Sequence, residues 1–215
     1  MPYKLIETGE EGKKPLIIYL HGYNQNLSIL EEKAESMLQL NAYHLFIQGP
    51  YPIYDITRQK KVAEWGRAWY LYDGDQDQFL KSMEISSEFI QEIVDSLAEV
   101  IQISRLCILG YSMGGYLAAY FAFSRYKHVN DLIVIGGRIK TEAFTGKLEQ
   151  AKHLNILALH GKNDTSVYPE PQEKAVQLLK QEGFNVDYKL MNEKHALTPA
   201  FLKKSLNWLK SLGYY

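Results

Sequence analysis

Short apolar runs alternate along this chain with longer stretches in which apolar residues recur at helical spacing. Continuous apolar runs are typical of parallel strands buried on both faces, and a period near 3.6 is typical of helices. Strands are expected at residues 15–20, 43–47, 105–109, 132–135, 156–159 and 186–190. Helices are expected at residues 27–40, 77–103, 113–126, 142–153, 170–182 and 199–212. This alternation predicts an α/β fold with a mostly parallel central sheet and helices on both faces.

The chain has 215 residues, enough for one sizeable core, and we expect a single domain over residues 1–215. Residues 136–155 carry their own helix pattern, so no separate cap domain is expected there. The connection 49–78 is long and aperiodic, and such connections in compact domains tend to be functional. Its aromatic residues either pin the loop to the sheet or wall an acyl pocket; the candidates for substrate binding are Trp65, Trp69 and Tyr70.

Charge and composition argue against several kinds of partner. The formal net charge is -1 and no basic block occurs, so neither a nucleic acid nor an anionic membrane surface is an expected partner. No apolar stretch approaches a membrane span, and the first residues lack the apolar core of a signal peptide. Cys107 is the single cysteine, so no disulfide within the chain is expected, and a cytoplasmic location follows. The oligomeric state is left open.

The strongest chemical signal is the segment Gly110-Tyr111-Ser112-Met113-Gly114. An expected strand precedes it and an expected helix follows, which is the context of the G-x-S-x-G nucleophile elbow. The sharp turn exposes the serine hydroxyl, and glycines lack the β-carbons that would collide there. The helix N-terminus directs backbone N–H groups toward a developing oxyanion. Ser112 is therefore the candidate nucleophile.

A serine nucleophile needs a histidine base and an acid that orients the base, and with this elbow the acid precedes the histidine in the chain. His195 lies in a loop between the last expected strand and the last expected helix. Asp164 follows the fifth expected strand, at the edge where open α/β sheets bind ligands. Asp187 is a weaker alternative near the start of a strand, and Asp131 opens a strand at the opposite edge. The predicted triad is Ser112, Asp164 and His195.

Two backbone N–H groups are candidates for an oxyanion hole. Met113 follows the nucleophile directly, and its N–H lies at the start of the expected helix. Tyr23 lies in the His-Gly-Tyr loop after the first expected strand, which is the usual place for the second donor.

The carboxylates of Asp73, Asp75 and Asp77 are spaced as in a calcium-binding loop. The segment lacks the glycine and terminal glutamate of such a loop, and carboxylates also suit a helix N-terminus. We therefore expect an acidic turn before a helix and no metal site.

Taken together, these motifs resemble the α/β-hydrolase superfamily, and more narrowly its small phospholipase/carboxylesterase branch, which includes acyl-protein thioesterases. The matching segments are residues 20–26, 48–52, 66–70, 110–115, 160–164 and 194–195. The resemblance implies a cap-less esterase without a cofactor, with the triad and oxyanion donors assigned above. The chain departs from the branch at Met113, where glutamine is frequent, and at Lys194, where glycine usually precedes the histidine. Both departures weaken any transfer of substrate preference.

The predicted function is hydrolysis of a small-molecule ester or thioester with a small to medium acyl group, through an acyl-enzyme. Two alternatives stay open. One is a small serine peptidase or amidase on the same scaffold, and the other is a non-catalytic binding protein that uses the same crevice. Comparison of matched ester and amide substrates distinguishes an esterase from a peptidase or amidase. Covalent labelling of the serine distinguishes an enzyme from a binding protein.

Overall fold

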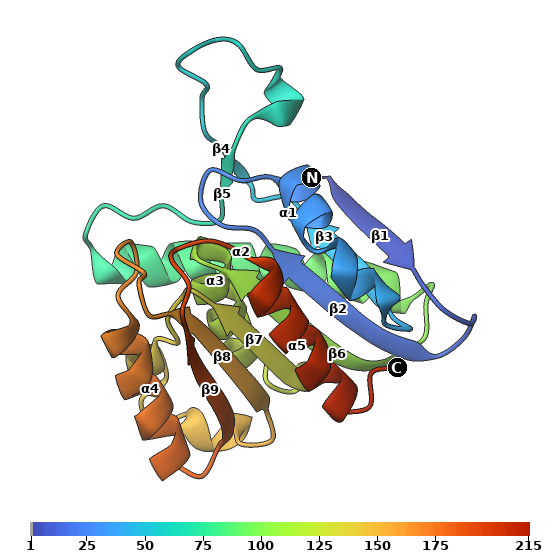
Figure 1. Ribbon diagram of the computed structural model, residues 1–215, viewed down its shortest axis with the longest axis vertical. Helices are drawn as coiled ribbons and strands as arrows, with labels where there is room; N and C mark the ends of the chain where they lie inside the picture. The colour runs from blue at the N-terminus through green and yellow to red at the C-terminus, as the bar shows by residue number, and fades with distance from the viewer. Residues whose placement is uncertain (1) are drawn as a thin grey trace.

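A seven-stranded, mostly parallel sheet lies between two layers of helices in the computed structural model, which describes residues 2–215 (Figure 1). The strand order is β1-β3-β2-β6-β7-β8-β9, and β1 alone pairs antiparallel, with β3. The strands are β1 (Tyr3–Glu7), β2 (Lys14–Leu20), β3 (Tyr43–Ile47), β6 (Ile103–Tyr111), β7 (Asp131–Ile135), β8 (Asn155–Gly161) and β9 (Asn185–Met191). The predicted fold class is confirmed.

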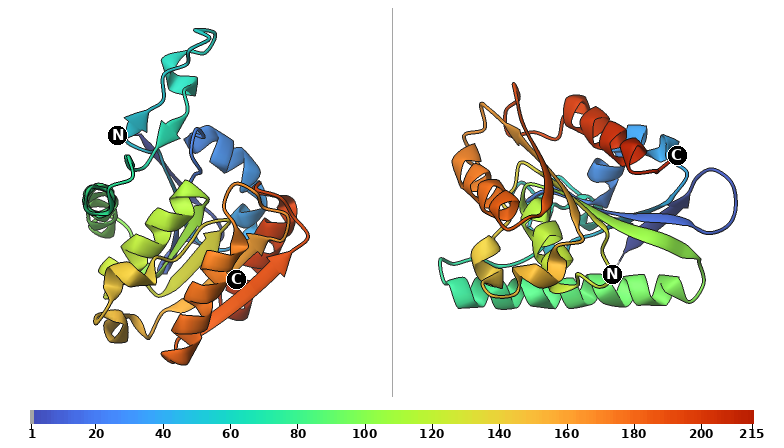
Figure 2. Two further views of the ribbon diagram at one scale, coloured as in Figure 1. Left: turned by 90° about the vertical axis from the view of Figure 1, so that its left-hand side faces the viewer. Right: turned by 90° about the horizontal axis from the view of Figure 1, so that it is seen from below.

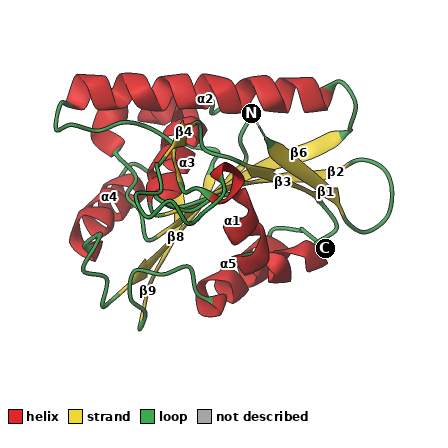
Figure 3. Cartoon of the chain, turned by 90° about the horizontal axis from the view of Figure 1, so that it is seen from above, coloured by secondary structure: helices red, strands yellow, loops and turns green. Residues whose placement is uncertain are grey.

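Helices cover both faces of this sheet, as Figure 3 shows from above. The helices are α1 (Leu27–Lys33) and α5 (Pro199–Ser211) on one face, and α2 (Gln76–Ala98), α3 (Met113–Ser124) and α4 (Pro169–Gln181) on the other. Alternate residues of β2 face the two layers, because Ile17 packs in the α1/α5 core and Ile18 in the α2/α3 core. This two-sided burial explains why the central strands read as continuous apolar runs. None of the helices formed by the described residues is long and apolar enough to cross a membrane.

Three expected helices differ from the structure. The helix expected at 27–40 ends at Lys33, and a 3-10 turn, Glu35–Gln39, follows it. Every third residue from one cap of this turn to the other is buried (Ala34, Met37 and Leu40). The helix expected at 142–153 is instead two 3-10 turns, Thr141–Phe144 and Leu148–Ala151. Gly146 separates these turns at a φ of 76°, a conformation that interrupts a helix. The helix expected at 77–103 ends earlier, and β6 begins at Ile103.

The long connection before α2 contains a small ribbon that the sequence did not predict. Strands β4 (Tyr51–Pro52) and β5 (Arg67–Ala68) pair antiparallel, and the chain between them carries a 3-10 turn, Val62–Glu64. This segment projects from one end of the molecule, as Figure 1 and the left view of Figure 2 show. Its base, the β4–β5 pair, lies beside the loop after β2. An antiparallel backbone bridge between Gln25 and Arg67 joins the two.

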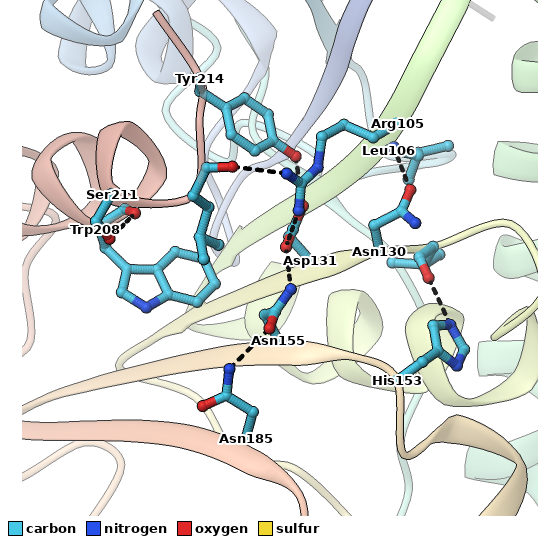
Figure 4. A network of polar contacts seen from close by, with 12 residues as sticks. Arg105, Leu106, Asn130, Asp131, His153, Asn155, Asn185, Trp208, Ser211 and Tyr214 are labelled. Atoms are coloured by element: carbon cyan, nitrogen blue, oxygen red, sulfur yellow. Dashed lines mark hydrogen bonds and ion pairs between the residues drawn. The ribbon is translucent and has the colours of Figure 1, made fainter.

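A buried polar network lies where β7 begins (Figure 4). The carboxylate of Asp131 is fully buried and accepts hydrogen bonds from Arg105 Nη2 (2.7 Å), Asn155 Nδ2 (2.9 Å) and Tyr214 Oη (2.5 Å). Arg105 also donates to the carbonyl oxygen of Leu212 at 2.8 Å. The network therefore fastens the chain after α5 to the sheet. It occupies the amino end of β7, opposite the edge that carries Ser112, so Asp131 stands apart from the serine as the sequence indicated.

Candidate active site

Ser112 stands at the turn between β6 and α3 in a backbone conformation that is rare for residues with a side chain. Its φ and ψ are 52° and -118°. A β-carbon on Gly110 would overlap the carbonyl oxygen of Gly114, so the strand and the helix approach this closely only with glycine. The backbone N–H of Ser112 donates to the carbonyl oxygen of Ile135 at 2.8 Å. The turn thereby holds the hydroxyl at the carboxyl edge of the sheet.

The structure brings the three predicted triad residues together. Ser112 Oγ lies 2.9 Å from His195 Nε2, and His195 Nδ1 lies 2.7 Å from Asp164 Oδ2. The Asp164 side chain is almost fully buried and that of His195 is 20% exposed. The three residues follow β6, β8 and β9, so they meet because parallel strands end at a common edge. The geometry matches a nucleophile, a base and an orienting acid.

Backbone contacts tie the loop of Asp164 to the loop of His195. Lys162 N–H donates to the carbonyl oxygen of Met191 at 2.7 Å, and Asn163 N–H donates to that of Glu193 at 2.9 Å. These bonds extend the β8–β9 pairing past the strand ends, so the two loops are positioned as one unit.

The Asp164 carboxylate is held at both oxygens. Oδ1 accepts from the N–H groups of Ser166 and Val167, each at 2.9 Å, which leaves Oδ2 for His195. His160 packs behind it, with Nε2 donating to the carbonyl oxygen of Val167 at 2.8 Å and lying 3.5 Å from Asp164 Oδ2. Two N–H donors and a fixed loop keep this carboxylate aimed at the imidazole.

The buried His21 holds the loop after β2, which carries the Tyr23 N–H. His21 Nδ1 donates to the carbonyl oxygen of Gly22 at 2.8 Å, and Nε2 accepts from Gly49 N–H at 3.0 Å. Gly22 N–H donates to Gln25 Oε1 at 3.1 Å, while Tyr23 N–H has no hydrogen-bond partner among the described residues.

Met113 N–H is the first of helix α3 and has no acceptor within the helix. Tyr23, Ser112 and Met113 line the same cavity. This arrangement suits the two predicted oxyanion donors.

Acid is expected to destabilise the fold through two buried histidines. Burial lowers the pKa of both His21 and His44 to about 4, from 6.5. Between pH 6.5 and 4 the unfolded chain therefore binds more protons than the folded protein. The free energy of unfolding should fall as the pH falls through this window, by up to about 1.4 kcal/mol per pH unit for each histidine. Urea unfolding at several pH values measures this slope.

The variant His44→Gln isolates one of the two contributions, because His44 lies in β3, away from the serine. We expect a shallower dependence on pH in this variant than in the native protein. An identical slope in the two proteins would mean that His44 is not the titrating group.

A cavity of about 680 Å³ opens beside Ser112, and of the three aromatic candidates only Tyr70 lines it. Trp69 is fully buried, with Nε1 donating to the carbonyl oxygen of His21 at 2.8 Å, so it supports the loop rather than contacting substrate. Trp65 packs edge-on against Tyr54, with ring centroids 5.1 Å apart, and lies outside the cavity lining. The expectation that Trp65 and Trp69 wall the pocket is therefore corrected.

Sequence reasoning missed much of the cavity wall, including all of its charged residues. Tyr116 comes from the start of α3, and Arg138 and Lys140 come from the loop after β7. A loop that follows the carboxyl end of a central parallel strand is a usual place for ligand contacts, and that signal was available for residues 136–140.

The spaced carboxylates are placed as expected for an acidic turn before a helix. Asp75 caps α2, accepting from Gln78 N–H at 2.8 Å, and Asp73 Oδ1 accepts from Asp75 N–H at 3.0 Å. Asp77 lies in the first turn of the helix. Carboxylates at these positions stabilise the positive end of the helix dipole.

The sheet, the elbow and the order of the loops that follow β6, β8 and β9 define an α/β hydrolase. The chain belongs to the Phospholipase/Carboxylesterase family, whose sequence profile matches residues 1–212.

Individual proteins resemble this chain over different extents. Lysophospholipase-like protein 1 of Mus musculus is 26% identical over 140 residues, which are 63% of this chain and 59% of the mouse protein. The match thus spans about three fifths of that relative. The acyl-protein thioesterase 2 of Zea mays has a similar structure, with a TM-score of 0.76, 20% identity and 98% of each chain covered. A carboxylesterase of Mesorhizobium loti aligns with a TM-score of 0.74 and 18% identity over 97% of this chain and 94% of that one.

Proposed function

We propose that this protein is a serine hydrolase that cleaves carboxylic esters or thioesters of small to medium acyl groups. The observation that carries the proposal is the chain of contacts from Ser112 Oγ to His195 Nε2 (2.9 Å) and from His195 Nδ1 to Asp164 Oδ2 (2.7 Å). Ser112 opens onto a cavity large enough for a small-molecule substrate. The family and the names of the relatives support hydrolysis of ester bonds.

The reaction is an acyl transfer in two steps. His195 Nε2 takes the proton of Ser112 Oγ as the oxygen attacks the ester carbonyl, and the N–H groups of Tyr23 and Met113 stabilise the oxyanion. His195 then gives that proton to the leaving alcohol or thiol, and the acyl group remains on Ser112. A water molecule repeats the sequence and releases the acid. Asp164 keeps the proton on Nδ1, so that Nε2 is free to act as the base.

Hydrolysis of 4-nitrophenyl esters from acetate to palmitate tests this proposal and measures the acyl site. Tyr70, Phe79 and Met113 give the cavity an apolar wall, and each buried methylene contributes about 0.8 kcal/mol. We therefore expect kcat/KM to rise by up to about fourfold per methylene until the chain outgrows the cavity. The chain length at the maximum measures the depth of the site.

Two further reagents separate the alternatives. The matched 4-nitroanilides should react far more slowly than the esters; comparable rates would favour a peptidase or amidase. A fluorophosphonate should label Ser112 stoichiometrically. Absence of both labelling and ester turnover would overturn the proposal and favour a binding protein. The cytoplasmic location, the single domain over residues 1–215 and the absence of a nucleic-acid partner stay predictions.

A further inference from the structure

Two cationic side chains, Arg138 and Lys140, line the cavity beside Ser112, whereas no carboxylate of the described residues lines it. The remaining lining is aromatic, aliphatic or uncharged polar. An apolar cavity with a low local dielectric strengthens the field of any charge in its wall. The electrostatic character of the substrate site is therefore set by these two cations.

A single carboxylate from outside the lining is shared between these cations. Glu142 Oε1 lies 2.9 Å from Arg138 Nη2 and 3.8 Å from Lys140 Nζ. Glu142 is about half exposed, so solvent weakens its interaction with both partners. Two positive charges against one negative charge leave the cavity wall with a formal excess of one positive charge.

Arg138 follows directly on the part of the loop that packs against the elbow of Ser112. Ser112 N–H donates to the carbonyl oxygen of Ile135, and the chain then passes through two glycines to Arg138. A β-carbon on Gly137 would lie 3.0 Å from the carbonyl oxygen of Ser112, so this loop packs directly against the elbow. The same loop therefore fixes Ser112 and presents Arg138 to the substrate cavity.

Both cations retain donor capacity. Arg138 Nε is buried and has no hydrogen-bond partner among the described residues. Lys140 Nζ donates to Gln76 Oε1 at 2.6 Å and lies 4.8 Å from the ring centroid of Phe79, which leaves other ammonium protons available. A buried donor without a partner is costly, and a guanidinium matches the geometry of a carboxylate or phosphate.

We propose that the natural substrate is an ester that carries a second, anionic group, which Arg138 and Lys140 bind while Ser112 attacks the ester carbonyl. The proposal rests on the hydrolase function above and specifies its substrate class. The anion is a carboxylate, on either the acyl or the leaving-group side of the ester. A neutral ester of equal length satisfies neither cation and should be the poorer substrate.

Two matched substrate pairs test the proposal and locate the anion. On the acyl side, mono-(4-nitrophenyl) adipate is compared with 4-nitrophenyl hexanoate. On the leaving-group side, 4-acetoxybenzoate is compared with 4-acetoxybenzamide. Each kcat/KM is divided by the uncatalysed rate of that ester, which removes differences in intrinsic reactivity. We expect the anionic member of one pair to be preferred by about tenfold to a hundredfold, the usual range for hydrogen bonds to a charged group.

Three variants should change the ratio of kcat/KM for the anionic ester to that for the neutral ester, two of them downward and one upward. Arg138→Gln and Lys140→Met should each lower the anionic-to-neutral ratio by about tenfold. Glu142→Gln removes the competing carboxylate and should raise the ratio, whereas a purely structural role for the three residues would not produce opposite signs. Lys147→Met removes an exposed lysine of the same connection, outside the cavity lining, and should leave the ratio unchanged.

A measurement on the native protein covers the case in which a variant fails to fold. Raising NaCl from about 0.05 to about 0.5 M shortens the range of electrostatic interactions, so the anionic-to-neutral ratio should fall. A ratio of one or less for both pairs in the native protein would overturn the inference while leaving the hydrolase function intact. The inference would also be overturned if neither Arg138→Gln nor Lys140→Met changed the anionic-to-neutral ratio. Absence of turnover with every ester would overturn the hydrolase function and this inference with it.

Discussion

Replacement of Ser112 by alanine is expected to lower kcat for ester hydrolysis by roughly a millionfold, as when the nucleophile of a serine triad is removed. The substitution deletes Oγ, the atom that lies 2.9 Å from His195 Nε2, and no other group replaces it as the acyl acceptor. The cavity and the backbone N–H groups of Tyr23 and Met113 remain. The variant should therefore still bind ester, and its residual rate measures what binding and the oxyanion hole contribute alone.

The same substitution should leave the free energy of unfolding nearly unchanged. Alanine experiences the same unfavourable φ as Ser112, and the backbone bond from residue 112 to the carbonyl oxygen of Ile135 is kept. Steady-state kinetics, thermal unfolding and the intact mass after fluorophosphonate treatment are measured together. Ser36→Ala, at an exposed serine outside the site, is the matched control and should keep full activity. Native activity in the Ser112→Ala protein would exclude Ser112 as the nucleophile.

The centre of the sheet was predictable because its strands are buried on both faces. Strands β2, β3, β6, β7 and β8 carry continuous apolar runs. Such short runs are typical of strands in the interior of a parallel sheet. Strand β1 lacks the signal, because it is an edge strand whose residues are exposed or half-buried. The ribbon β4–β5 is too short to show any period. Strands β1, β4 and β5 are therefore recognised by the strands with which they pair and not by a pattern in their own residues.

Ser112 was found from its local motif, whereas its meeting with the other candidate triad residues followed from topology. Once β6, β8 and β9 are parallel strands of one sheet, the loops after them share an edge, and Ser112, Asp164 and His195 come within reach of one another.

The cavity wall could not be predicted in the same way. Trp69 and Tyr70 are adjacent in sequence and equally aromatic, yet one supports His21 and the other faces the cavity. Which ring faces the substrate depends on how the β4–β5 ribbon packs on the loop after β2. Sequence pattern alone does not determine that packing.

Replacement of Asp164 by asparagine is expected to lower kcat by about ten-thousandfold with little change in the position of the imidazole, as when the acid of a serine triad is made an amide. Asparagine keeps an oxygen for the N–H groups of Ser166 and Val167, so its amide NH₂ faces His195 Nδ1. An NH₂ group donates and Nδ1 must then accept, which moves the imidazole proton to Nε2. That proton points at Ser112 Oγ, so the histidine is unable to act as the base.

Kinetics of Asp164→Asn against Asp187→Asn test this reasoning with a matched pair. Asp187 is exposed and accepts from Trp208 Nε1 at 2.9 Å, so its loss should leave kcat within a few-fold of native. Fluorophosphonate labelling should slow in parallel with kcat for Asp164→Asn, because both reactions need the hydroxyl of Ser112 to be deprotonated by His195. If Asp164→Asn retained native kcat, or if Asp187→Asn lost it, Asp164 would not be the acid of this site. Slow turnover with native labelling would instead assign Asp164 to deacylation alone.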